Sequence, residues 1–189
     1  SLRGAQLAVE PRKQWVRGGS RPRIPAERRA ETGRALSVDG DGGWGSVVRQ
    51  ARHGDHACPD GLIDATARVV KGWQPSPPPA WVTSVPSTSS GELVADFAQR
   101  VASSLGLPYR EVLRRTRPGR PQSEMQNSFQ QLRNVDGAFE VTEPLADEPV
   151  LVVDDLVDSG WTLAVVADAL RGAGAGAVHP LVLAKARGG

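Results

Sequence analysis

Apolar positions from residue 80 onward follow two alternating patterns along the chain. Short unbroken runs, such as Val150-Leu151-Val152-Val153, have no polar alternation and predict strands buried on both faces of a parallel sheet. Between these runs, apolar positions at three- and four-residue spacing predict helices with one buried face. The clearest such face consists of Leu93, Val94, Phe97, Ala98, Val101 and Leu105. The alternation predicts an α/β fold with an open, mostly parallel sheet and helices on both faces.

The individual segments of this region are bounded mainly by Gly and Pro. Strands are predicted at 80–85, 109–113, 137–141, 150–155 and 178–184, and helices at 93–105, 122–134 and 163–173. The last strand contains Pro180, which lacks the amide proton that a ladder hydrogen bond needs. This strand is therefore expected near an edge of the sheet.

The first 79 residues have a different pattern, with helical spacing and many breakers. Helices are predicted at 26–37, 44–50 and 59–73, the last with Pro59 as its first residue. The stiff segment Gln74-Pro75-Ser76-Pro77-Pro78-Pro79 follows them. It predicts a boundary between a smaller, mainly helical appendage or hood at 1–79 and a core at 80–189.

Length and composition are those of one soluble domain, with or without an appendage. The 189 residues are 39% hydrophobic and 23% charged, and no apolar run approaches a membrane span of about 20 residues. A single cysteine excludes an internal disulfide and predicts the reducing environment of the cytoplasm. The chain begins without an apolar leader and without an initiator Met, as a fragment of a longer protein would.

Charge is distributed unevenly, although the net charge is only +2. Residues 1–34 hold nine Arg or Lys against three Glu, and residues 134–171 hold nine Asp or Glu against one Arg. The basic end suits nucleic acid or an acidic partner surface. A solvated tail that packs against the acidic half is the alternative.

Two adjacent carboxylates, Asp154 and Asp155, stand at the C-terminal end of the predicted strand 150–155. Open α/β sheets bind their ligands at this end of their strands. The loop 158–162 follows and opens a helix, so its backbone N–H groups and the helix N-terminus form an anion site. Hydroxyl groups suit the carboxylates and a phosphate suits the loop, and a ribose 5-phosphate offers both. An ordinary buried strand with a polar turn is the alternative.

The segment Val150–Thr162 resembles the 13-residue signature of type I phosphoribosyltransferases at every position. The resemblance implies the α/β fold of that family and phosphoribosyl pyrophosphate (PRPP) or a nucleotide as ligand. The residues that would hold its 5-phosphate are Asp158, Ser159, Gly160, Trp161 and Thr162.

The same resemblance implies catalytic roles for three carboxylates and Mg²⁺ as the cofactor. Asp154 and Asp155 would lie beside the ribose hydroxyls and the metal, which they would hold partly through water. Asp158 stands where the hypoxanthine-guanine branch of the family has its general base. A loop Asp that caps the following helix explains Asp158 equally well.

The pyrophosphate loop that the resemblance implies comprises Ser84, Pro86, Ser87, Thr88 and Ser89. Family members often carry Arg or Lys in this loop, and this chain has none there, which weakens the case for turnover of PRPP. A basic segment with Arg114, Arg115, Arg117 and Arg120 could close over the site as a lid and supply the charge. A solvated charge run is the competing interpretation.

Further stretches resemble two narrower groups. The ComF-like branch of phosphoribosyltransferases is similar at Arg120-Pro121-Gln122, Asn127, Arg133-Asn134 and Gly137-Ala138-Phe139. Three stretches resemble the C-terminal region of RecQ-type ATP-dependent DNA helicases of high-GC bacteria: Val9-Glu10-Pro11-Arg12-Lys13-Gln14-Trp15, Gly33-Arg34-Ala35-Leu36 followed by Gly43-Trp44-Gly45, and Asp154–Thr162. The chain has no G-x-x-x-x-G-K-[ST] phosphate loop, so it is not itself the helicase motor.

Three functional hypotheses follow from these observations. The first is a domain that binds PRPP or a ribose 5-phosphate nucleotide, as the accessory domain of a RecQ-type helicase. The second is a stand-alone ComF-like or purine-type phosphoribosyltransferase that uses Mg²⁺. The third is a DNA-binding accessory domain that uses residues 1–34 and 114–120. No membrane partner is expected.

Overall fold

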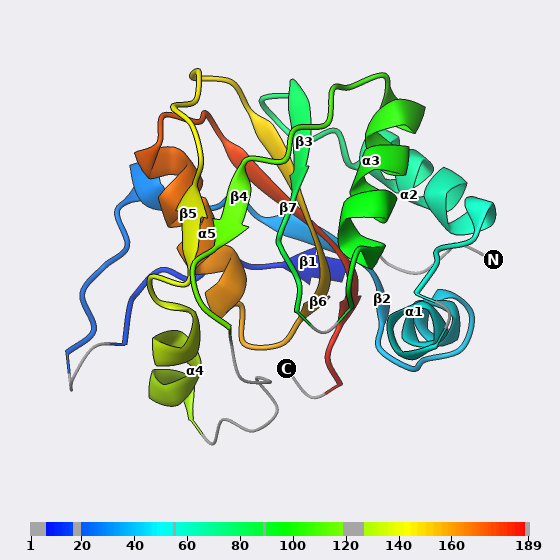
Figure 1. The fold of residues 1–189 in the computed structure, drawn as a ribbon, viewed down its shortest axis with the longest axis horizontal. Coiled ribbons are helices and arrows are strands. Elements are labelled where there is room, and N and C mark those ends of the chain that lie inside the picture. Colours follow the sequence, from blue (N-terminus) through cyan, green and yellow to red (C-terminus); the bar gives the residue numbers. More distant parts are fainter. Residues whose placement is uncertain (1–6, 17–19, 55, 89, 119–126, 188–189) are drawn as a thin grey trace.

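A five-stranded sheet forms the centre of the computed structural model, which describes residues 7–16, 20–54, 56–88, 90–118 and 127–187. Its strand order is β1 (Leu7–Val9), β2 (Gly33–Val38), β7 (Val178–Lys185), β6 (Val150–Val157) and β3 (Trp81–Ser84). Only the β1–β2 pair is antiparallel (Figure 1). The predicted mostly parallel sheet is therefore confirmed.

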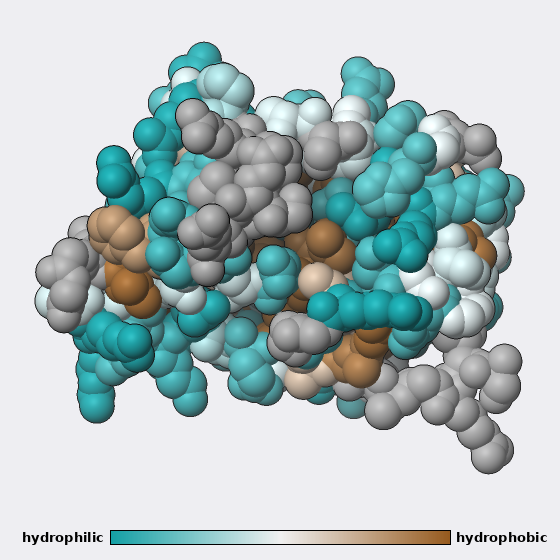
Figure 2. Space-filling model, turned by 90° about the horizontal axis from the view of Figure 1, so that it is seen from below, coloured by the Kyte–Doolittle hydropathy of each residue, from teal (hydrophilic) through white to brown (hydrophobic). Residues whose placement is uncertain are grey.

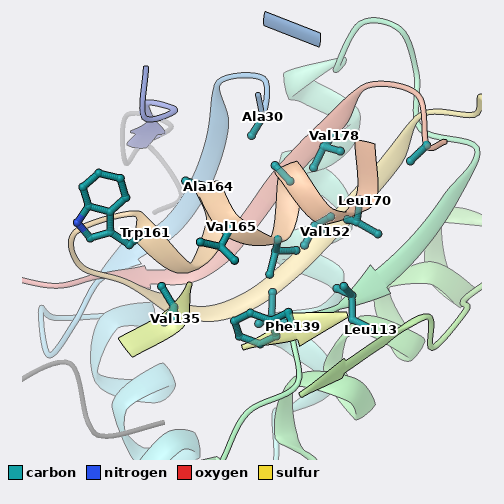
Figure 3. Close-up of a cluster of buried hydrophobic side chains, with 14 of the residues drawn as sticks. Ala30, Leu113, Val135, Phe139, Val152, Trp161, Ala164, Val165, Leu170 and Val178 are labelled. Atoms are coloured by element: carbon teal, nitrogen blue, oxygen red, sulfur yellow. The ribbon is translucent and has the colours of Figure 1, made fainter. Parts of the chain in front are cut away.

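Helices cover both faces of this sheet, as the unbroken apolar strands predict. On one face Val150 and Val152 pack with α5 (Trp161–Gly172) and α4 (Ser128–Val135). On the other face Leu151 and Val153 pack with three helices, α1 (Trp44–His53), α2 (Asp60–Trp73) and α3 (Leu93–Leu105). Figure 3 shows the first of these clusters, with side chains of α5 gathered beside Val152.

A second, two-stranded antiparallel sheet lies beside α5. It consists of β4 (Leu113–Arg115) and β5 (Phe139–Val141). The strand predicted at 109–113 is thus displaced: Tyr109 meets Val82 of β3 by a single bridge, and the regular strand begins only at Leu113. The start predicted for α4 at residue 122 falls outside the described residues.

The helix predicted at 26–37 is wrong. Only a short 3-10 turn, η1 (Ala26–Arg28), forms there, and β2 begins at Gly33. The burial of β2 alternates residue by residue, because one side of the strand faces the core while its backbone pairs with β7. Good local helix formers are overridden here by pairing with a strand that lies more than 140 residues later in the chain.

The edge position predicted for the last strand is also wrong, since β7 lies between β2 and β6. Pro180 is tolerated because the ladder with β2 starts one residue later, at Arg34 and Leu181. The carbonyl of Val178 accepts a hydrogen bond from the backbone N–H of Glu31, on the β2 side. The backbone nitrogen of Pro180, two residues later, points to the same side, toward β2. Because the β2–β7 ladder has not yet started there, its missing N–H leaves no ladder hydrogen bond unmade.

The proposed division at residue 79 stays a prediction. Strands β1 and β2 come from the first 79 residues, yet they belong to the same sheet as β3, β6 and β7. Helix α2 likewise packs against α3. Within the described ranges, no helix combines the length and apolarity that crossing a bilayer requires.

Candidate functional site

The carboxyl ends of β2, β3, β6 and β7 meet at one edge of the sheet, because these four strands are parallel. Figure 2 shows this edge face-on, with hydrophobic atoms near the centre and hydrophilic atoms around them. The loop after β6 carries the predicted phosphate site, and the loop after β3 carries the predicted pyrophosphate site. The backbone N–H of Val85 donates to the carbonyl of Val153 at 2.9 Å, so the two loops start side by side.

Asp154 and Asp155 are both buried within β6, with 5% and 7% of their surface exposed. The backbone N–H of Asp155 donates to Oδ1 of Asp154 at 2.9 Å. Burial, and then the adjacent charge of Asp155, raise the pKa of Asp154 well above its usual range. Ionisation of Asp154 is therefore disfavoured at this edge of the sheet. Such a shifted pKa is common at functional sites.

Arg52 of α1 is a member of this site that sequence reasoning missed. Its Nε donates to Oδ2 of Asp155 at 3.0 Å, and its Nη1 lies 3.5 Å from Oδ1 of Asp39, just after β2. The side chains of Arg52 and Asp155 are only 11% and 10% exposed. The pair is thus a nearly buried ion pair that fixes one of the two predicted catalytic carboxylates.

The loop between β6 and α5 has the backbone geometry of an anion site. Gly160 has φ 79° and directly precedes α5, so the helix is capped by this glycine and not by Asp158. Asp158 is exposed, while Ser159, Gly160 and Thr162 are half-buried. The N-terminal segment reaches this loop, where Nε of Arg12 donates to the carbonyl of Ser159 at 2.7 Å.

The side chain of Trp161 does not face a ligand, although it belongs to the predicted phosphate loop. It is fully buried at the start of α5 and stacks on Trp15, with 6.3 Å between ring centroids (Figure 3 labels Trp161). The guanidinium of Arg12 lies 4.2 Å from the centroid of the Trp161 ring. Trp161 therefore offers only its backbone N–H to the loop, and its ring anchors the N-terminal segment.

The predicted pyrophosphate loop follows β3 and is held by its own hydroxyl groups. Oγ of Ser84 and the hydroxyl of Tyr109 are 2.8 Å apart. The backbone N–H and the hydroxyl of Ser90 donate to Oγ of Ser87, the hydroxyl at 2.7 Å. Pro86 is half-buried and Thr88 is exposed, and Ser89 lies outside the described residues. The described part of this loop is neutral.

The four lid residues divide in the structure. Arg115 is half-buried, and the charge of Asp154 acts on its guanidinium, whose pKa is lowered chiefly by burial. Arg114 instead pairs with Glu140 across the small sheet. Arg117 donates to the backbone carbonyls of Arg133 and Asp136. Arg120 lies outside the described residues. Arg115 donates to the carbonyl of Arg117 and lies 5.0 Å from the centroid of the Phe139 ring, so the described lid residues form no ion pair with Asp154 or Asp155.

The residues at the site do not enclose a metal ion by themselves. In the part of the chain that the structure describes, no three His, Cys, Asp or Glu side chains gather as a metal cluster. Mg²⁺ commonly binds through one or two carboxylates and takes its other oxygens from water and substrate phosphates. Asp154 and Asp155 fit that second kind of site.

Replacing Asp154 with Asn is expected to stabilise the chain at neutral pH by about 1–2 kcal/mol. The raised pKa means that the folded state loses stability as pH rises from the ordinary Asp pKa, about 3.9, through the folded pKa. Asn removes that loss and still accepts the N–H of Asp155. Urea denaturation at pH 4, 6 and 8 should show a gain that grows with pH. The exposed control Asp64→Asn should show little change, and an equal gain at every pH would contradict the argument.

Comparisons with known proteins give a family match and similar solved structures. The family model of the phosphoribosyl transferase domain matches residues 95–189, half of the chain. A purine phosphoribosyltransferase from Pyrococcus horikoshii Ot3 is similar in structure, with 21% identity, coverage of 67% of this chain and 71% of that one, and a TM-score of 0.43. An adenine phosphoribosyltransferase is also similar in structure, with 19% identity and a TM-score of 0.44. The match covers 66% of this chain and 69% of that one. No curated protein sequence matches the chain. By its match over residues 95–189, the chain belongs to the phosphoribosyl transferase domain family.

Proposed function

We propose that the chain binds PRPP or another ligand with a ribose 5-phosphate at the carboxyl edge of its sheet. The observation that carries the proposal is the placement of Asp154 and Asp155, buried at the end of β6, directly before the glycine-capped loop that opens α5. Both parts lie on one continuous segment, so their separation suits a ligand with hydroxyls at one end and a phosphate at the other.

Each part of the segment has a separate task in this proposal. Backbone N–H groups of 158–162 and the hydroxyls of Ser159 and Thr162 bind the 5-phosphate. Asp154 and Asp155 accept hydrogen bonds from the ribose hydroxyls. Arg52 donates to Oδ2 of Asp155 and so holds that carboxylate in place for the ligand. A bound Mg²⁺ would add positive charge beside the pyrophosphate, held by these two carboxylates, water and the ligand.

Binding is better supported than transfer of the phosphoribosyl group. The described part of the loop after β3 has no cation for a pyrophosphate leaving group. Among the described lid residues, Arg115 at the end of β4 is the cation on which the charge of Asp154 acts. It would have to bind the pyrophosphate leaving group from that position. Asp158 is exposed and free of the helix-cap position, which suits a base that meets an acceptor from solvent. Release of pyrophosphate from PRPP with any base would establish transfer.

Calorimetry with PRPP and with ribose 5-phosphate, with and without Mg²⁺, tests the proposal. Asp154→Asn/Asp155→Asn should weaken binding at least about tenfold, since the lost charge-assisted hydrogen bond to Asp155 alone contributes about 1.5–3 kcal/mol. The matched control is Asp64→Asn/Asp147→Asn, which removes the same charge from exposed positions. Equal affinity in the double variant and the control would reject the site.

A second proposal concerns the setting of this domain at the C-terminus of a RecQ-type helicase. It rests on the resemblance of Pro11-Arg12-Lys13-Gln14-Trp15, and two of these residues, Arg12 and Trp15, contact Trp161 of the phosphate loop. Two of the stretches that resemble the helicase tail are thus in direct contact. Sequencing the gene upstream of the Ser1 codon tests this setting. A continuous frame with a helicase motor supports it, and a start codon directly before Ser1 rejects it.

A further inference from the structure

A basic hairpin formed by residues 12–16 and 20–24 packs against the start of α5 and the loop before it. Its two arms are joined by backbone hydrogen bonds of 2.9 Å, from Trp15 to Pro22 and from Ile24 to Lys13. In Figure 1 these arms are the blue segments on the left of the molecule. Trp15, stacked on Trp161, and the fully buried Ile24 fix the hairpin to the core. The hairpin is therefore a rigid support for the side chains it presents.

A groove of about 530 Å³ runs along this hairpin, and its lining is almost entirely cationic. Five of the seven lining residues are Arg or Lys, and none is Asp or Glu: the five are Arg12, Lys13, Arg21, Arg23 and Arg29. Lys13, Arg21 and Arg23 are exposed. Within the described part of the chain, the side chains of these three make no ion pair or hydrogen bond. The fold thus holds like charges together without neutralising them.

Two of the cations shape the groove and leave the other three to bind. Arg12 donates to the carbonyl of Ser159, and Nη2 of Arg29 donates to the carbonyl of Ile24 at 2.6 Å. Like charges held close together repel, so a groove of this kind is stabilised by an anion with several charges. Small-molecule pockets are mostly apolar, whereas Val16 is the one apolar residue that lines this groove.

We infer that this groove binds the phosphodiester backbone of double-stranded nucleic acid. Sites for single strands combine a basic groove with aromatic platforms on which bases stack. The aromatic ring of this hairpin, Trp15, is buried against Trp161 and offers no such platform. Regularly spaced phosphates need only cations on a rigid support, and recognition of this kind is independent of sequence. The inference stands apart from the ribose 5-phosphate site.

Fluorescence anisotropy with labelled 20-base-pair duplexes of DNA and of RNA tests the inference. With three to four phosphates neutralised, the logarithm of the affinity for DNA should fall with the logarithm of salt at a slope of about −3, or about 60-fold between 50 and 200 mM. The arm that binds more tightly identifies the natural duplex. A poly-glutamate competitor that displaces the duplex at equal charge concentration would overturn the inference in favour of an acidic protein surface.

Substitution decides whether the groove is responsible. Lys13→Ala/Arg21→Ala/Arg23→Ala should remove most of the binding at 50 mM salt and bring the slope close to zero. These side chains are exposed, and circular dichroism checks that the variant folds. The matched control, Arg68→Ala/Lys71→Ala/Arg133→Ala, removes the same charge from exposed positions on α2 and α4 and should retain the slope. Equal losses in both variants, or no binding by the unchanged protein, would overturn the inference.

Discussion

Replacing Arg52 with Met is expected to lower the free energy of unfolding by about 3–5 kcal/mol. Arg52 and Asp155 form an ion pair at 3.0 Å, with side chains that are 11% and 10% exposed. Removing the cation leaves the Asp155 charge buried beside Asp154, where its solvation is poor. In a chain of this length, each kcal/mol corresponds to about 2–4 °C, so thermal denaturation should show a loss of about 10 °C.

Two further variants separate the buried charge from simple loss of packing. Arg52→Met/Asp155→Asn removes the orphaned charge as well, and it should recover more than half of the lost stability. Arg49→Met removes a cation from the same helix, but its side chain is 58% exposed and lies 3.8 Å from Asp39, so a change below about 1 kcal/mol is expected. A double variant as unstable as Arg52→Met would show that Arg52 acts through packing alone.

The central part of the fold could be predicted from the sequence because its signals are local. The apolar run that starts at Val150 and the helical spacing after Gly160 each identify one element, and their order fixes the topology. β2 could not be predicted in this way. The helix formers directly before it, at 26–31, extended the predicted helix into β2, whose residues form a strand because β7 offers a buried pairing surface at the middle of the sheet.

The candidate site was predictable in part for the same reason. Asp154, Asp155 and the loop after them lie on one segment, so their order in the sequence places them together. Arg52 comes from a helix 103 residues earlier, and no spacing connects it with Asp155. The helix predicted at 44–50 ended before Arg52, and the burial of Val48, four residues earlier on α1, is seen only in the structure.

Replacing Trp161 with Ala is expected to cost about 3–5 kcal/mol and to release the basic hairpin from the core. Trp161 is fully buried, stacks on Trp15 at 6.3 Å and lies under the guanidinium of Arg12. Its loss opens a cavity between α5 and the hairpin. Urea denaturation should show the lost stability, and trypsin should cut after Arg23 faster than in the unchanged protein. The control Phe129→Ala, at a side chain that is 38% exposed, should change stability by less than about 1 kcal/mol.

A conservative substitution distinguishes this anchoring role from direct contact with a ligand. The indole Nε1 of Trp161 is buried and has no hydrogen-bond partner among the described residues, so Trp161→Phe leaves no partner group unpaired. We expect Trp161→Phe to cost less than about 1.5 kcal/mol and to bind ribose 5-phosphate within about threefold of the unchanged affinity, because only the backbone N–H at this position faces the loop. A folded Trp161→Phe protein that loses the phosphate ligand would instead place the indole ring in the binding site.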